Sequence, residues 1–287
     1  MVDQLKAVVL VDDAKNPVKP ELYAKHGLSI YLEMRVGSET ITALVDTGPS
    51  SEVLLHNADA LDVDLKKVQV ILLSHGHYDH TGGVIGALTR VRESIPVLAH
   101  PKTFDPKFAY RPHIRHIGSP VSRSELQAAG GIVLTATNPV NIGPGVMSSG
   151  EIERSTAFEE VKGFWRVDEE RFVRDLMVDD QALIINLDGQ GLVIVAGCAH
   201  AGIINTVQHA QRITGVSRVH TVLGGFHLRN ASTGRVAATT QELRTVDPSI
   251  IGPCHCTGSK AIRRFTDTFQ DRCTPLCVGA LVEIKST

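Results

Sequence analysis

Four residues that can bind a divalent metal ion lie within six positions of the sequence. They form the motif His75-x-His77-x-Asp79-His80. Imidazole and carboxylate groups are ligands that suit zinc and related divalent ions. Four ligands exceed what one tetrahedral ion takes from a single loop, which predicts two adjacent ions. We expect His75 and His77 to bind one ion and Asp79 and His80 to bind the other. Asp79 is also expected to orient the oxygen atom that would attack a substrate.

The segment before this motif predicts how its side chains are positioned. Residues 69–73 form a short apolar run, typical of a buried strand, that leads directly into the motif. In extended chain His75 and His77 point the same way because they are two residues apart. The glycines within and after the motif then let Asp79 and His80 turn to a neighbouring point. A histidine-rich surface loop is the alternative, and the buried strand before the motif argues against it.

Further histidines follow predicted strands in the second half of the chain. Cys198 and His200 follow a strand over 192–196, His227 follows one over 220–223, and His255 follows one near Ile250. Ligands in α/β layers bind at the ends of strands, so these side chains are expected to gather at one cleft. His227 is expected there as a catalytic residue that contacts substrate or transfers a proton, rather than as a metal ligand.

The elements that carry these residues alternate between strand and helix. In the first half, residues 28–36 and 40–45 predict a hairpin, and 52–61 predict a helix with Ser51 as its N-cap. A second helix is expected over 83–93 and a strand over 96–99. In the second half, strands over 182–187 and 192–196 form a hairpin, and helices are expected over 203–213, 235–246 and 260–269.

Length and composition indicate an ordinary globular protein. The 287 residues include 43% apolar and 21% charged residues, which excludes general disorder. The formal charge of −2 gives no long-range field for nucleic acid or for an anionic membrane, so neither partner is expected. No apolar run approaches the roughly 18 residues of a membrane span, and the N-terminal apolar core is too short for an export signal. These features predict a cytoplasmic protein, and five cysteines do not suggest a disulfide framework.

Together these motifs resemble the metallo-β-lactamase superfamily. The motif HxHxDH after a strand and the upstream turn Asp46-Thr47-Gly48 carry the resemblance. The strings LVDTGP, GCAHAGIINT, GGFHL and PCHCTG are similar to a branch named for 7,8-dihydropterin-6-methyl-4-(β-D-ribofuranosyl)aminobenzene-5′-phosphate synthase. The resemblance implies an α/β fold, an αββα sandwich with its metal site at one edge where two sheets meet. We expect a single domain over 1–287, with halves over about 1–100 and 180–287 flanking an irregular insertion or lid over about 101–179.

The resemblance also implies further metal ligands. His255 corresponds to the superfamily's final histidine and completes the second ion with Asp79 and His80. Cys198 occupies the position where many relatives have a metal-bridging aspartate, so it is either a ligand or a small buried residue. His200 is expected to fill a ligand position for which the interval between the two halves offers no matching histidine. Cys254 and Cys256, which flank His255, are expected to point to the opposite side of that strand.

Asp46 is expected to hydrogen-bond to a metal-binding histidine, on the side of the ring that faces away from the ion. A carboxylate that accepts the free N–H of a ligating imidazole fixes its tautomer and raises its basicity. The implied activity is that of a metal-dependent hydrolase, in which a hydroxide bound between two ions attacks phosphorus or a carbonyl carbon. Histidine and carboxylate ligands suit zinc, manganese or iron, and any thiolate favours zinc or iron.

The middle segment combines basic and aromatic residues. Arg111, His113 and Arg115 are expected to bind substrate, as part of a lid that also carries Lys107 and Phe108. Such a lid would suit a phosphorylated or pterin-like small molecule. A solvated loop with extended basic side chains is the alternative.

Two other functions remain open. One is a general phosphodiesterase, or a lactone or thioester hydrolase, on the same scaffold. The other is a noncatalytic metal-binding sensor whose site is blocked by its own lid. No sequence pattern indicates an oligomeric state.

Overall fold

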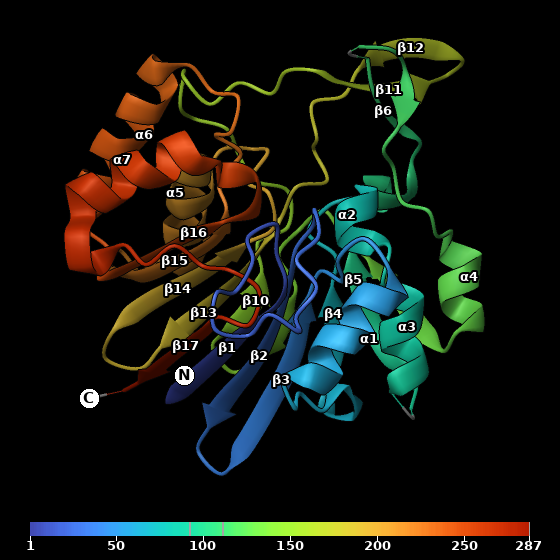
Figure 1. Cartoon of the computed structure of the whole chain (residues 1–287), viewed down its shortest axis with the longest axis horizontal. Coiled ribbons are helices and arrows are strands. Elements are labelled where there is room, and N and C mark those ends of the chain that lie inside the picture. The colour runs from blue at the N-terminus through green and yellow to red at the C-terminus, as the bar shows by residue number, and fades with distance from the viewer. Residues whose placement is uncertain (92, 111, 287) are drawn as a thin grey trace.

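Two β-sheets pack face to face, and helices cover the outer face of each (Figure 1). This computed structural model describes residues 1–91, 93–110 and 112–286. Arg111, which was expected to bind substrate, lies outside these residues. Among the residues described, no helix is long and apolar enough to cross a membrane.

The first sheet is built from the N-terminal part of the chain and its last strand. Its strands, in spatial order, are β17 (Leu281–Lys285), β1 (Gln4–Val11), β2 (Ser29–Val36), β3 (Glu39–Val45), β4 (Val70–Leu72), β5 (Ile95–Ala99) and β8 (Gly131–Thr135). Strands β17 to β3 pair antiparallel, whereas β3, β4, β5 and β8 pair in parallel. The parallel strands therefore end at the same edge, where the histidine motif follows β4.

The second sheet contains the strands of the second half. In spatial order they are β16 (Ile250–Cys254), β15 (Val219–Gly225), β14 (Gly191–Ala196), β13 (Ala182–Leu187), β10 (Val146–Ser148) and β9 (Asn141–Gly143). Strands β14, β15 and β16 are parallel neighbours, so their C-terminal ends also share one edge.

Seven helices and four 3₁₀ turns connect the strands within the described residues. The helices are α1 (Ser51–Ala60), α2 (Tyr78–Thr81), α3 (Val84–Arg90), α4 (Arg123–Ala128), α5 (Ile203–Thr214), α6 (Thr233–Val246) and α7 (Ser259–Phe269). The 3₁₀ turns are η1 (Leu65–Lys67), η2 (Pro101–Phe104), η3 (His255–Thr257) and η4 (Gln270–Arg272). The predicted cap of α1 was wrong by one residue, because Ser50 adopts the extended cap conformation and accepts the N–H of Val53.

Three apolar clusters hold the four layers together. The alternation along β13 shows the arrangement, since Ile185 belongs to the cluster between the sheets and Ile184 to the cluster beneath α5, α6 and α7. On the other side, Ile71 of β4 and Val84 of α3 belong to a third cluster, beneath the helices of the first half. These layers confirm the αββα sandwich.

The middle segment adds short strands to three sheets. Strand β8 extends the first sheet, and β9 and β10 extend the second, so a small part of residues 101–179 belongs to the two main sheets. A separate sheet, here called the lid sheet, contains β6 (Lys107–Ala109), β7 (Arg115–His116), β11 (Phe164–Asp168) and β12 (Arg171–Arg174). Figure 1 shows β6, β11 and β12 at the upper right, beyond α2. The insertion is therefore irregular over more than half of its length, as predicted, and the short strands that it contains pair with distant partners.

A buried ion triad fastens the lid sheet to the histidine loop. Lys107 is 1% exposed, and its Nζ lies 3.0 Å from Asp175 and 2.9 Å from Asp179. Burial by itself lowers the pKa of Lys107, but the charges of Asp179 and Asp175 outweigh it and raise that pKa. Asp179 also accepts the N–H of Gly76 at 2.8 Å. Lys107 is therefore a structural residue and not the phosphate-binding group that the basic segment suggested.

Candidate metal centre

Three histidine nitrogens converge where the two sheets meet. His75 Nε2 lies 3.0 Å from His77 Nδ1 and 3.2 Å from His200 Nε2. All three side chains are buried. We call these residues the first subsite. It joins the strand ends of both sheets, since His75 follows β4 and His200 follows β14.

A second group of side chains lies directly beside the first. His80 Nε2 is 3.3 Å from His255 Nε2 and 3.1 Å from Cys198 Sγ. Asp79 Oδ2 lies 3.5 Å from His255 Nε2 and 3.7 Å from His80 Nε2. These four residues form the second subsite. The rings of His75 and His80 lie with their centroids 4.2 Å apart, so the two subsites are adjacent.

The backbone of the motif changes conformation halfway. His77 is extended and forms a β-bridge with Gly118 of the middle segment, as the strand-end interpretation requires. Tyr78–Thr81 then forms the single turn of α2, which brings Asp79 and His80 to the second subsite. Gly76 is required for close packing, because a Cβ there would lie 1.9 Å from the carbonyl oxygen of Thr103.

Asp46 contacts the outer ring nitrogen of His80 directly, and it reaches the outer ring nitrogen of His75 through the hydroxyl of Ser74. Its Oδ2 lies 2.6 Å from His80 Nδ1 and accepts the hydroxyl of Ser74 at 2.7 Å. Ser74 Oγ in turn lies 2.9 Å from His75 Nδ1. Because Ser74 donates its proton to Asp46, it must accept from His75 Nδ1. This tautomer leaves the Nε2 lone pair of His75 directed at the first subsite.

Asp13 holds His255 in the same way, and it was not among the predicted site residues. Its Oδ1 lies 2.7 Å from His255 Nδ1, its Oδ2 lies 3.0 Å from His26 Nδ1, and it also pairs with Arg229. The Nε2 of His26 lies 3.2 Å from Asp79 Oδ2, at the exposed side of the second subsite. The signal was present in the sequence, because Asp12-Asp13 directly follows the apolar strand β1 as Asp46 follows β3.

Burial keeps the first subsite neutral. It lowers the pKa of His75 and of His200 well below the usual value, and it lowers that of His77 to about 3. Burial also acts against the charged form of His80, but the charges of Asp46 and Asp79 outweigh it and raise the pKa of His80 to about 9. Three neutral imidazoles beside a carboxylate suit a cation.

The spacing and chemistry of these groups fit divalent metal ions. With metal–nitrogen bonds of about 2.0–2.1 Å, neighbouring ligands of a tetrahedral ion lie about 3.3–3.4 Å apart. The contacts between inward nitrogens are 3.0, 3.2 and 3.3 Å. Groups of buried His, Cys and Asp side chains that could hold an ion include His75, His77 and His200, and also His75, His80 and Cys198. The centre can therefore hold divalent metals, as superfamily members typically do.

The lid sheet covers the first subsite with an aromatic ring. The ring centroid of Phe164 in β11 lies 5.1 Å from that of His77, 4.9 Å from His200 and 5.6 Å from His227. His227 is half-buried and lies with its ring centroid 4.2 Å from that of His200. Its Nδ1 has no hydrogen-bond partner in the part of the chain that the structure describes. His227 thus lies beside the ligands with one free nitrogen.

Strand register places Arg115 on the face of the lid sheet that Phe164 uses. Arg115 pairs with Ala109, which pairs with Phe164, and residues directly opposite in antiparallel strands share a face. Burial and the charge of Asp79 raise the pKa of Tyr78, and the charge of Arg115 opposes that rise, which places Arg115 near the phenol. His113 is exposed in the loop between β6 and β7.

Contrary to the prediction, the two cysteines beside His255 do not point to the same side of the chain. Cys254 ends β16 and packs in the cluster between the sheets. The chain then enters η3, where His255 has φ +49°, and this reversal turns Cys256 toward Cys198. Cys256 Sγ lies 3.5 Å from the carbonyl oxygen of Cys198 and accepts the N–H of His227 at 3.3 Å. The prediction for Cys256 was wrong because β16 ends at Cys254 and does not continue through Cys256.

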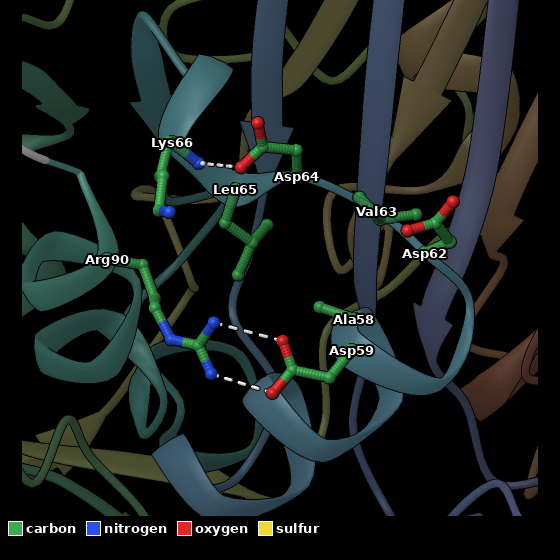
Figure 2. Close-up of a pocket in the computed structure, with 8 residues that line it drawn as sticks. All are labelled: Ala58, Asp59, Asp62, Val63, Asp64, Leu65, Lys66 and Arg90. Carbon is green, nitrogen blue, oxygen red and sulfur yellow. Dashed lines mark hydrogen bonds and ion pairs between the residues drawn. The ribbon is translucent and has the colours of Figure 1, made fainter.

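A separate surface hollow lies at the end of α1, beside η1 (Figure 2). Arg90 and Asp59 form a bidentate ion pair across it, with N–O distances of 2.9 and 2.7 Å. None of the residues that line this hollow belongs to either subsite. The pair joins α3 to α1 and has a structural role.

Comparison with known proteins identifies the family. A family model described as the metallo-beta-lactamase superfamily matches residues 26–167. A curated protein of Methanocaldococcus jannaschii is 32% identical over 288 residues, which cover 98% of this chain and 97% of the relative. The chain belongs to the metallo-β-lactamase superfamily. That relative is named 7,8-dihydropterin-6-methyl-4-(beta-D-ribofuranosyl)-aminobenzene-5'-phosphate synthase, so the resemblance found in the sequence is confirmed.

Two further proteins match along most of the chain. An uncharacterized protein of the same archaeon is 30% identical and covers 90% of this chain and 93% of its own length. A solved structure described as a metal-dependent hydrolase of the beta-lactamase superfamily superposes with a TM-score of 0.82 at 25% identity, covering 98% of this chain and 100% of that one.

Proposed function

We propose that this protein is a metal-dependent hydrolase that holds two adjacent divalent ions and acts on a phosphorylated small molecule. The observation that carries the proposal is the convergence of ligand-type side chains from both sheets on one buried point. These residues are His75, His77, Asp79, His80, Cys198, His200 and His255.

The two subsites divide these ligands. The first would hold one ion through His75, His77 and His200, and the second would hold the other through Asp79, His80, Cys198 and His255. Bound divalent ions supply Lewis acidity, which polarises a substrate oxygen, and they lower the pKa of coordinated water. Imidazole together with a thiolate favours zinc, with iron next and manganese less suited.

The remaining residues bind and orient the substrate. Arg115 lies on the lid face that carries Phe164, where a guanidinium can pair with a phosphate group. His227 offers its free Nδ1 beside the first subsite, where it can hydrogen-bond to substrate or transfer a proton. Phe164 excludes water from the ligands and offers an aromatic face for a ring of the substrate.

The names of the relatives differ on the reaction. The M. jannaschii relative is named a synthase for a phosphorylated pterin product, whereas the structure with a TM-score of 0.82 is described as a hydrolase. The site supports hydrolysis, because its ligand-type side chains could hold divalent ions that lower the pKa of coordinated water. A phosphorylated substrate agrees with the basic lid.

An activity screen tests this function. Protein loaded with zinc or manganese is incubated with bis(p-nitrophenyl) phosphate, a γ-lactone and an acyl thioester. We expect phosphoester turnover that a chelator abolishes and added metal restores. Turnover of only the lactone or the thioester would favour the general-hydrolase alternative. Tight metal binding with no turnover of any substrate would favour the noncatalytic sensor, in which Phe164 blocks the site.

Replacing Asp46 by asparagine is expected to weaken metal affinity by about 10–100-fold, since outer carboxylates orient ligating imidazoles. One carboxylate oxygen of Asp46 accepts from His80 Nδ1 and Ser74 Oγ and the other accepts the N–H of Ser74, whereas an amide has only one oxygen and must direct its NH2 at one of these donors. Competition with a chromophoric chelator measures the affinity. Asp188→Asn, in the exposed turn between β13 and β14, is the matched control and should not change it. Equal affinities in the two variants would contradict the role of Asp46.

Replacing Arg115 by alanine is expected to raise KM for bis(p-nitrophenyl) phosphate by about 10-fold or more while kcat changes little. The loss corresponds to about 1.5–3 kcal/mol for a hydrogen bond to a charged group. Arg174→Ala is the control, because its register opposite Trp165 places it on the other face of the lid sheet. KM for an uncharged p-nitrophenyl ester should stay constant. An equal rise for both substrates would exclude Arg115 as the anion-binding group.

A further inference from the structure

We propose that Cys256 is a metal ligand, so that the second subsite binds its ion through two thiolates, those of Cys198 and Cys256. This inference rests on the metal centre of the proposed function. The sulfur atoms of both cysteines and a ring nitrogen of His255 all lie within 4.8 Å of one another, and all three residues are buried. Together with His80 and Asp79 of the same subsite, two cysteines and a histidine form a donor set of sulfur, nitrogen and oxygen atoms that suits zinc, which can take five ligands.

The backbone is shaped to bring this sulfur to the centre. Regular continuation of β16 would place Cys254 and Cys256 on the same side, facing away from the ligands. Instead His255 adopts φ +49°, a conformation that is uncommon for a residue with a side chain. The turn sends Cys254 into the core between the sheets and returns Cys256 to the centre. Backbone strain of this kind is often kept where a site requires it.

Space for the sulfur is provided by a glycine. A Cβ at Gly225 would lie 2.6 Å from Cys256 Sγ, so any larger residue at the end of β15 would displace the thiol. The N–H of His227, two residues later, points at the same sulfur at 3.3 Å. Backbone N–H groups directed at a thiolate stabilise its negative charge. The surroundings of Cys256 thus accommodate a sulfur and supply it with a donor.

A thiolate pair would set the metal preference of the second subsite. Soft thiolate ligands favour zinc and iron, whereas carboxylate and water ligands suit manganese and magnesium. The second subsite would therefore bind zinc more tightly than manganese. The first subsite, with three imidazoles only, would discriminate less.

X-ray absorption at the zinc edge tests the ligand set in the unmodified protein. With both ions bound, we expect two zinc–sulfur bonds for each pair of ions, both of them at the second subsite. A second sample, loaded with cobalt, should show a thiolate-to-cobalt charge-transfer band. Cys256→Ser should lower the intensity of that band by about half and zinc affinity by about 10-fold or more. Cys254→Ser, a neighbour buried in the core, is the control and should leave both unchanged.

The outcomes separate this inference from the proposed function. A single zinc–sulfur bond, or a full charge-transfer band in Cys256→Ser, would show that Cys256 only packs and donates to the carbonyl of Cys198. Turnover of a phosphoester together with that result would overturn the ligand role and leave the hydrolase intact. Two zinc–sulfur bonds without turnover of any substrate would support Cys256 as a ligand and exclude the hydrolase. The absorption measurement needs no variant, so misfolding of Cys256→Ser cannot obscure the answer.

Discussion

Replacing His77 by alanine is expected to remove at least one of two metal equivalents and to lower hydrolysis by at least about 100-fold. His77 Nδ1 lies 3.0 Å from His75 Nε2 inside the first subsite, and its loss leaves that ion only His75 and His200. Lewis-acid stabilisation of several kcal/mol is lost with the ion, which corresponds to two or more decades in rate. Elemental analysis measures the metal content, and phosphoester turnover measures the activity. Asp79→Ala at the second subsite is expected to lose metal and activity in the same way.

A matched histidine variant separates metal loss from general damage. His220 is half-buried near the start of β15, whereas the metal centre lies beyond the other end of that strand. His220→Ala should keep both metal equivalents and its activity. Circular dichroism should show all three proteins folded. A full metal load in both His77→Ala and Asp79→Ala would count against these two residues as ligands.

Replacing Lys107 by methionine is expected to destabilise the protein by about 3–5 kcal/mol, the cost of breaking a buried ion pair by removing one partner. The change leaves the carboxylates of Asp175 and Asp179 buried without their cation. Because Asp179 also holds the N–H of Gly76, the histidine loop should loosen and metal affinity should fall. Chemical denaturation of the metal-free protein measures the free energy of unfolding.

Two further variants sharpen this experiment. Lys102→Met removes a half-exposed lysine that pairs with Asp105 at 3.5 Å, and it should cost no more than about 1 kcal/mol. Adding Asp179→Asn to Lys107→Met removes one uncompensated charge and should restore part of the stability. If the free energy of unfolding of Lys107→Met fell by less than about 1 kcal/mol, the ion triad would not be the contact that holds the lid sheet in place.

The local pattern of the chain determined the family, the layers and most of the centre. An apolar strand followed by a histidine-bearing turn is a local signal, and it recurs after β4, β14, β15 and β16. Because the ends of parallel strands share an edge, this signal predicts that His200 and His255 lie near each other. That His75 meets them where two sheets join was implied by the resemblance to the superfamily. The turn Asp46-Thr47-Gly48 after β3, through its resemblance to the superfamily, singled out Asp46.

Tertiary structure alone decided which groups complete and cover that centre. Asp13 is 242 positions from His255 in the chain, and nothing local to either residue indicates that they pair. Cys256 faces Cys198 because β16 ends at Cys254 and His255 adopts a positive φ, and strand ends are set by packing rather than by composition. Lys107 resembles its exposed basic neighbours until β6 pairs with β11 and buries it beside two carboxylates. Contacts between distant segments depend on how the sheets and the lid pack, and a periodic pattern in one segment carries no information about its partner.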